Sequence, residues 1–316
     1  MIQPWKVPHL VRGMLTFVPA VNRWRAPSRA TGGSDSARYC YAVWLRHLVM
    51  LSRYGFTLQD RTVCELGPGD SIGAGIAALL GGARRYIALD AVPYSTTTDL
   101  RQMTADLAQL YESRQPIPDH DEFPGIRPRL TSYEFPRQAI CTDSLQERIR
   151  LVTDAVNSGL HTANGMIAYH APWRSVHDVA AGSLDLVFSQ AVLQYVDALK
   201  DLYRSMFTWL KGGGYASHAT GLGANDFAPM WNGHWAYSDR EWRLVRGRRE
   251  YMLNREPLST HLRLAASAGF DILHAEPQYS HRGLARQAIA RRFRSLQPDD
   301  LAACGVMLIL RKPEAH

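Results

Sequence analysis

The sequence predicts an α/β protein with an open sheet, and two neighbouring stretches carry this prediction. Thr62–Leu66 is a short apolar run, a glycine-rich turn with Gly67 and Gly69 follows, and residues 72–80 are apolar enough to form a helix. A second apolar run ends in Asp90, about 20 residues after the turn. This order places the turn beyond the carboxyl end of a strand, which is where ligands bind in open α/β sheets.

The turn and the acid suit a nucleotide-like ligand. Gly67 and Gly69 carry no side chain and can take positive φ, so a ligand can approach the backbone closely. In nucleotide-binding α/β folds an acid placed like Asp90 accepts hydrogen bonds from ribose hydroxyls. The alternatives are a glycine-rich turn without a cofactor role and a solvated carboxylate at a strand end.

The turn and a later stretch share features with one enzyme family. The order E-L-G-P-G-D-S-I-G, from Glu65 to Gly73, resembles the first motif of class I S-adenosylmethionine (SAM) methyltransferases, E/D-x-G-x-G-x-G. Glu65, Gly67 and Gly69 match this motif, and the third glycine is displaced to Gly73. Residues 182–196, G-S-L-D-L-V-F-S-Q-A-V-L-Q-Y-V, closely resemble the family's fourth-strand pattern.

The resemblance covers roughly residues 61–310 apart from two insertions, with its motifs in the family's order. It implies the family's fold, a doubly wound, seven-stranded, mostly parallel Rossmann-like sheet with helices on both faces. It also implies SAM as the cofactor and S-adenosylhomocysteine as its product. The cofactor contacts that we expect come from Glu65, Gly67, Pro68, Gly69, Asp90, Ala171, Trp173, Ser189 and Gln190.

The sequence departs from the family's pattern in two places. The histidine that usually ends the fourth-strand motif is Tyr195, so no base is carried over from that position. The acid that usually follows the third strand is replaced around residues 170–172. We therefore expect backbone groups and stacking on Trp173 to hold the adenine; the alternative is that Trp173 is a core residue.

The chain is expected to divide into an N-terminal arm with a helix, residues 1–60, and a methyltransferase domain, residues 61–310. Helical spacing of apolar residues predicts a helix from Ala37 to Tyr54 that packs on the sheet or roofs the glycine turn. Residues 1–36 predict an extended arm with little regular structure. An insertion at about 91–160 is interpreted as a cap over the substrate side, with a partner-binding element as the alternative.

A second insertion, at about 220–257, is rich in aromatic residues. Trp231, His234, Trp235 and Tyr237 follow the expected fifth strand closely. Such rings combine a flat apolar face with a polar group, so they suit the wall of a site for a sugar ring. Together with Tyr195 they are the predicted substrate contacts; the alternative is a hydrophobic plug that anchors the loop.

Methyl transfer from a sulfonium needs alignment of the acceptor, and a base if the acceptor is a hydroxyl. Histidine suits that task because its pKa is near neutral. His218 is the first candidate, at the carboxyl end of a fifth strand expected at residues 215–219, followed by His234 and His170. The alternative for each is a buried histidine with satisfied hydrogen bonds.

A metal site is not predicted, although a divalent metal remains an alternative. Asp226 and Asp143 could bind a metal ion together. The acidic stretch 118–122 contains one histidine and is interpreted as a solvated turn.

Composition and charge indicate the compartment and the relation of the chain to membranes. The 316 residues carry a net charge of +7, almost all of the basic residues being arginine, and four scattered cysteines predict reduced thiols in a cytoplasmic protein. No apolar run reaches the ~18 residues of a transmembrane segment. The apolar run from Leu10 to Val21 is expected to dock on the body of the protein, with contact to a membrane surface as the alternative.

We therefore expect an O-methyltransferase that acts on a small molecule, with a sugar or glycan precursor as the favoured acceptor. An RNA methyltransferase is the alternative that the positive charge supports, but no nucleic acid is favoured as a partner. A non-catalytic or aminopropyl-transferring relative on the same fold is the third hypothesis. A homodimer is compatible with the sequence.

Overall fold

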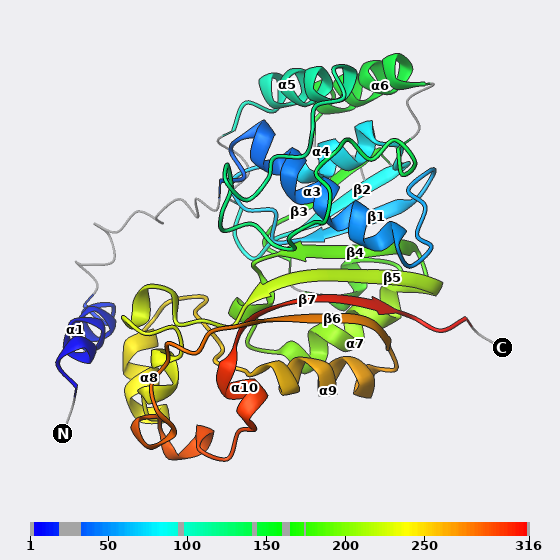
Figure 1. Ribbon diagram of the computed structural model, residues 1–316. Coiled ribbons are helices and arrows are strands. Elements are labelled where there is room, and N and C mark those ends of the chain that lie inside the picture. The colour runs from blue at the N-terminus through cyan, green and yellow to red at the C-terminus, as the bar shows by residue number, and fades with distance from the viewer. Residues whose placement is uncertain are drawn as a thin grey trace.

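The structure is a computed structural model that describes residues 3–18, 33–93, 98–140, 144–159, 165–173 and 175–314. Its centre is a seven-stranded sheet with the strand order β3-β2-β1-β4-β5-β7-β6 (Figure 1). Neighbours from β3 to β5 are parallel, and β7 is antiparallel to both β5 and β6. The strands are β1 Thr62–Leu66, β2 Arg85–Leu89, β3 Ile167–His170, β4 Leu184–Gln190, β5 Leu210–Gly221, β6 Asp271–Tyr279 and β7 Ala303–Arg311.

Helices cover both faces of this sheet, which confirms the predicted doubly wound α/β fold. Four helices form one layer, and α7 and α9 pack on the opposite face (Figure 1). The first layer consists of α3 Ala37–Ser52, α4 Gly73–Leu80, α5 Leu100–Glu112 and α6 Leu145–Asn157. The opposite face carries α7 Leu199–Trp209 and α9 Leu258–Ala268.

The strand order positions a site. Strand β1 pairs with β2 on one side and with β4 on the other, so the chain reverses its winding direction between β1 and β4. Crossovers on opposite faces leave a crevice beyond the carboxyl ends of the strands at such a switch point. The turn after β1 lies at this point.

The helix predicted over residues 37–54 is confirmed as α3. Its N-cap is Ser36, whose hydroxyl accepts a hydrogen bond from the Tyr39 N–H. The helix packs on the sheet and also covers the turn after β1, because a Cβ atom at Gly73 would lie only 2.6 Å from the Cys40 sulfur. Both roles considered for this helix from the sequence are therefore present.

Two expectations about the insertions and the arm need correction. The arm is not irregular throughout, because Val7–Leu15 forms helix α1. Within the first insertion α5 and α6 pack on α4 in the helical layer, and of its described residues only Ala91 and Val92 line the pocket described below. It is therefore part of the crossover from β2 to β3 rather than a cap, because its apolar helix faces complete the core on that side.

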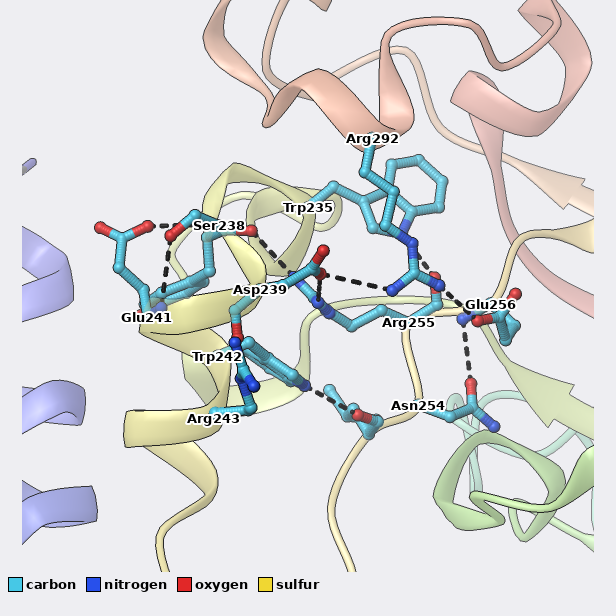
Figure 2. A network of polar contacts seen from close by, with 12 residues as sticks. Trp235, Ser238, Asp239, Glu241, Trp242, Arg243, Asn254, Arg255, Glu256 and Arg292 are labelled. Atoms are coloured by element: carbon cyan, nitrogen blue, oxygen red, sulfur yellow. Dashed lines mark hydrogen bonds and ion pairs between the residues drawn. The ribbon is translucent and has the colours of Figure 1, made fainter.

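The second insertion forms a small lobe beside the sheet together with two other segments, α1 and the residues around 284–296. Its own helix is α8 Asp239–Arg246. Figure 1 shows α1 and α8 side by side, and the two helices are in contact. Its polar centre is Arg255, which Figure 2 shows between Asp239 and Trp242. The Arg255 guanidinium donates to the Tyr237 carbonyl at 2.8 Å and to the Asp239 carboxylate at 2.6 Å.

Arg255 also lies between two aromatic rings of the lobe. Its guanidinium carbon is 4.9 Å from the Trp242 ring centre and 5.1 Å from that of Phe293. Burial lowers the pKa of Arg255 to about 10, so it remains charged at neutral pH. The lobe is thus a packed unit with a buried, paired cation at its centre.

Candidate cofactor and acceptor site

A pocket of about 720 Å³ opens at the carboxyl ends of β1, β2 and β4, at the switch point of the sheet. Its volume lies within the range of small-molecule and cofactor sites, about 300–1,000 Å³. It is lined by Ser34, Tyr39, Cys40, Val43, Glu65, Leu66, Gly67, Pro68, Gly69, Ser71, Ala74, Leu89, Asp90, Ala91, Val92, Trp173, Gln190, Ala191, Val192, Gln194, Tyr195, Val196, Leu202, Asn225, Asp226 and Tyr251.

The glycine turn has the conformation that the sequence predicted. Gly67 has φ +62° and Gly69 has φ +76°, both in the left-handed region. A Cβ atom at Gly67 would lie 2.7 Å from a methyl carbon of Val192, which follows β4. Glycine is therefore required at Gly67 both for its backbone angle and for the close approach of the β4 end.

Asp90 reaches from the end of β2 back to this turn. One carboxylate oxygen accepts the Ala91 N–H at 2.7 Å, and the other lies 3.4 Å from the Gly69 N. Burial raises the pKa of Asp90 to about 6, although these backbone hydrogen bonds oppose the rise. The two elements singled out in the sequence therefore meet at one point of the pocket.

Glu65 is buried at the end of β1. Its carboxylate accepts a hydrogen bond from the Tyr86 hydroxyl at 2.5 Å. Burial raises the pKa of Glu65 to about 8, and the nearby charge of Asp90 acts in the same direction. A cationic group bound beside Glu65 would favour the carboxylate, so its binding would release a proton.

A hydrogen-bonded chain behind the pocket fixes Gln190. The Ser217 hydroxyl lies 2.7 Å from His47 Nδ1, and His47 Nε2 lies 3.2 Å from the Gln190 side-chain oxygen. Burial lowers the pKa of His47 to about 4, so the ring is neutral and bonds through one tautomer. Sequence reasoning missed this role, because His47 is one polar residue within a largely apolar helix.

The far end of the pocket brings Tyr195 together with the second insertion. The Tyr195 hydroxyl accepts a hydrogen bond from the Asn225 side-chain amide at 2.7 Å. Burial raises the pKa of Tyr195, so its own proton is retained at neutral pH and is free to be donated. Asp226 and Tyr251 complete this end. Of the predicted substrate residues Tyr195 is the one that lines the pocket.

The charged residues that line the pocket are all acids. They are Glu65, Asp90 and Asp226, and no described lysine, arginine or histidine lines it. The net charge of the chain is +7, so this acidity is a local property of the site. Burial raises the pKa of Glu65 to about 8, so the negative charge at neutral pH comes mainly from Asp90 and Asp226, which favour neutral and cationic groups beside them.

The structure does not bring His218 to the pocket. Strand β5 ends at Gly221 rather than at residue 219, so His218 lies inside the sheet, fully buried. Its Nδ1 lies 2.8 Å from the Ser189 hydroxyl, and burial lowers its pKa to about 3. His218 and Ser189 therefore form a core pair, and neither lines the pocket.

The aromatic stretch of the second insertion also turns away from the pocket. Trp235 packs on Phe293, with ring centres 5.7 Å apart, and Tyr237 lies 5.3 Å from Trp242. His234 is buried against Trp235, and burial, with the Arg255 charge, lowers its pKa to about 3. None of these residues lines the pocket, nor does Trp231. These residues match the alternative interpretation, a hydrophobic plug that anchors the loop, because their rings form the core of the lobe.

The end of β3 contributes one of its three predicted residues. Trp173 lines the pocket, with its indole N–H donating to the Ser175 carbonyl at 2.7 Å and its ring 5.6 Å from that of Trp209. Ala171 and His170 are partly buried but do not line the pocket. Trp173 is thus both a packed residue and a wall of the site.

The described ranges hold no group of three or more histidine, cysteine or carboxylate side chains placed to bind a metal ion. Asp119 accepts the Asp121 and Glu122 N–H groups, and Glu122 pairs with Arg38, so this acidic stretch forms a turn. Asp143, the partner considered for Asp226, lies outside the described residues.

No family model and no curated protein matches the sequence. Among solved structures, the chain is similar to a SAM-dependent methyltransferase from Mesorhizobium loti, at 15% identity and TM-score 0.41, covering 84% of this chain and 96% of that one. It is also similar to phosphoethanolamine N-methyltransferase 2 from Haemonchus contortus, at 14% identity and TM-score 0.44, covering 90% and 59%. A third is geranyl diphosphate C-methyltransferase from Streptomyces coelicolor, at 13% identity and TM-score 0.43, covering 85% and 78%. At these identities and TM-scores the likeness assigns no reaction to the chain.

Proposed function

We propose that this chain is a SAM-dependent methyltransferase and that the pocket at the switch point binds the cofactor. The observation that carries the proposal is the meeting of Asp90 with the turn of Gly67 and Gly69 in the wall of a pocket of about 720 Å³. This arrangement offers a carboxylate to ribose hydroxyls beside a backbone that a ligand can approach closely.

The other walls suit the remaining parts of the cofactor. The Trp173 ring offers a face for adenine next to Ala91 and Val92. Glu65, at the end of β1, is placed to compensate a positive charge such as an ammonium group. When bound, SAM supplies an electrophilic methyl group on a sulfonium.

The protein's own part in the reaction is alignment and proton removal. Gln190, fixed by His47, and Tyr195, fixed by Asn225, offer hydrogen-bonding groups at the acceptor end. Asp226 is the carboxylate of that end and replaces the predicted histidines as the candidate base, because His218, His234 and His170 do not line the pocket.

The acceptor that these groups favour is a hydroxyl of a small uncharged molecule. Amide and phenol groups bind hydroxyls without requiring charge, and a carboxylate can take the hydroxyl proton. A sugar or glycan precursor remains a candidate of this class, although the aromatic wall first expected to bind it is packed inside the lobe. The acidity of the pocket disfavours polyanions such as RNA.

Calorimetric titration with SAM and S-adenosylhomocysteine tests the proposal. We expect saturable binding by the wild-type protein and a loss of about tenfold or more in Asp90→Ala, because two charge-assisted hydrogen bonds to the ribose disappear. Asp271→Ala is the matched control, since Asp271 is an exposed carboxylate at the start of β6. Equal binding by both variants, or no binding by the wild type, contradicts the proposal.

Methyl transfer is then measured with labelled SAM against uncharged sugars and phenols, with amines as a second panel. Transfer to hydroxyls that falls in Asp226→Asn supports the assigned acceptor and base. Transfer to amines alone would retain the methyltransferase assignment and reject the hydroxyl, because the acidic pocket also accepts cations.

A further inference from the structure

Helix α1 and the turn after it expose an apolar face. Six large apolar side chains within twelve residues are between 40% and 48% exposed: Val7, Val11, Met14, Leu15, Phe17 and Val18. Their spacing of three and four residues places most of them on one side of the helix. Backbone hydrogen bonds continue through the turn, from the Phe17 N–H to Met14 and from the Val18 N–H to Leu15.

The opposite side of α1 is fixed to the lobe by a close backbone contact. A Cβ atom at Gly13 would lie 1.9 Å from the Leu244 carbonyl oxygen of α8. The Thr16 hydroxyl donates to the Gly13 carbonyl at 2.6 Å and accepts the Arg248 N–H at 2.8 Å. The packed side of α1 is thus defined, and its apolar outer face is not needed for that packing.

Positive charge lies beside this face. Residues 3–18 contain no aspartate or glutamate, and the exposed Arg12 follows Val11 on α1. The exposed Arg248 lies with its guanidinium 5.5 Å from the Phe17 ring. On α8 the exposed Leu244 continues the apolar surface, and Arg240 lies one helical turn before it.

Two acids of the neighbourhood, both on α8, are paired. Glu241 pairs with Lys6 at 3.4 Å and caps α8 through Ser238. Asp239 pairs with Arg255 at the centre of the lobe. The outer face of α1 therefore combines exposed aliphatic side chains with the exposed Arg12 and Arg248, and Asp226 is the acid whose charge reaches the helix, at His9.

We propose that this face docks onto the surface of a lipid bilayer that contains anionic lipids. An amphipathic helix of this kind lies in the interface, with its apolar side chains among the acyl chains and its basic residues at anionic headgroups. Helix α1 has nine residues, far fewer than the roughly 20 that cross a bilayer. In the part of the chain that the structure describes, no helix is long and apolar enough to cross a membrane.

Other partners fit the face less well. Proteins that bind single-stranded nucleic acids stack the bases on aromatic rings, whereas five of the six exposed side chains are not aromatic. A second copy of the chain in symmetric contact would bring like charges together. Docking would also set the acceptor end of the pocket near the bilayer, because Phe227, next to Asp226, lies 5.8 Å from His9 of α1.

Co-sedimentation of the 316-residue chain with vesicles tests the inference. Vesicles of phosphatidylcholine alone are compared with vesicles that also contain phosphatidylglycerol, at low and high salt. We expect binding to the anionic vesicles that weakens with salt, and about a tenfold or greater loss in the double variant Val11→Ser, Met14→Ser. Arg12→Gln is expected to weaken binding to anionic vesicles by a few-fold.

The matched control is Leu151→Ser with Ile272→Ser, two side chains that are 38% exposed elsewhere on the surface. Circular dichroism confirms that all variants fold. Binding that is equal in the α1 variant and the control, or absent in the wild type, overturns the inference. So does a wild-type dimer that the α1 variant converts to a monomer without any vesicle binding. This readout needs neither cofactor nor acceptor, so it is independent of the proposed methyl transfer.

Discussion

Two regions near the carboxyl edge of the sheet concentrate residues suited to ligand binding, yet the structure uses them differently. The turn after β1 and the end of β2 line a pocket, with Gly67, Gly69 and Asp90 in its wall. The stretch from Trp231 to Tyr237 is richer in aromatic and histidine side chains, but it packs inside the lobe. Residue type alone therefore does not identify a site; attachment to a strand end at the switch point does.

The largest expected effect is a loss of stability that distinguishes a core role of the aromatic residues in the lobe from a ligand-binding role. Trp235→Ala should lower the free energy of unfolding by about 3–5 kcal/mol, because a fully buried indole leaves a cavity. Denaturant unfolding followed by circular dichroism measures this loss. If Trp235 were a ligand wall, the variant would keep its stability and lose ligand affinity instead.

The centre of the lobe gives a second, somewhat smaller effect. Arg255→Met should cost about 2–4 kcal/mol of unfolding free energy, because the Tyr237 carbonyl loses its donor and two rings lose a cation. Arg292→Met is the control, since Arg292 pairs with Asp239 and Glu256 near the surface and should cost about 1 kcal/mol or less. Equal losses in the two variants would contradict the central role of Arg255.

The glycine turn can be tested by a pair of alanine variants. Gly67 and Gly182 share φ +62°, but a Cβ atom at Gly67 meets Val192 at 2.7 Å, whereas none lies within 4 Å at Gly182. Gly182→Ala should lower the free energy of unfolding by about 1 kcal/mol, because alanine disfavours this backbone angle. Gly67→Ala should cost about 1–3 kcal/mol more and weaken SAM binding, because the turn must shift. Similar stability and affinity in the two variants would show that the turn tolerates a side chain.

The sequence predicted the scaffold well and the site in part. The strands expected at residues 62–66 and 215–219 and the helices expected over residues 37–54 and 72–80 are present. Buried parallel strands are apolar runs and helix faces have a clear period, so both can be predicted. The cofactor end could be predicted because its residues directly follow predicted strands, as Gly67 follows β1 and Asp90 follows β2, so that the strand places them. His218 was misplaced because β5 continues to Gly221, so a strand boundary two residues further along put its ring in the core.

The acceptor end could not be predicted in the same way. Asn225, Asp226 and Tyr251 reach the pocket through the packing of a whole lobe, which no local pattern encodes. His47 joins Gln190 across tertiary contacts from a helix far earlier in the chain. One feature of the sequence could have indicated a role for His47. The helix that contains it was expected to cover the glycine turn, so its residues were candidates for the surroundings of the pocket.

The last prediction concerns the pH dependence of ligand affinity. Because burial raises the pKa of Glu65 to about 8, a cation that binds beside it must displace a proton at lower pH. The affinity of the wild type relative to Glu65→Gln should therefore rise with pH up to about 8, by at most about tenfold per pH unit. Titration of the ligand itself changes the affinity of the wild type and of Glu65→Gln alike. The ratio of the two affinities at each pH therefore reports the titration of Glu65. A ratio that stays constant with pH would place the ligand's positive charge elsewhere.

The central claim is that the pocket at the switch point, and not the aromatic lobe, binds the cofactor. A crystal structure of the protein with S-adenosylhomocysteine tests it most directly. The account predicts the ribose hydroxyls on the Asp90 carboxylate, the adenine against Trp173, and an unchanged Trp235 packed on Phe293. Ligand density among Trp231, His234 and Trp235, with the turn at Gly67 unoccupied, would contradict it.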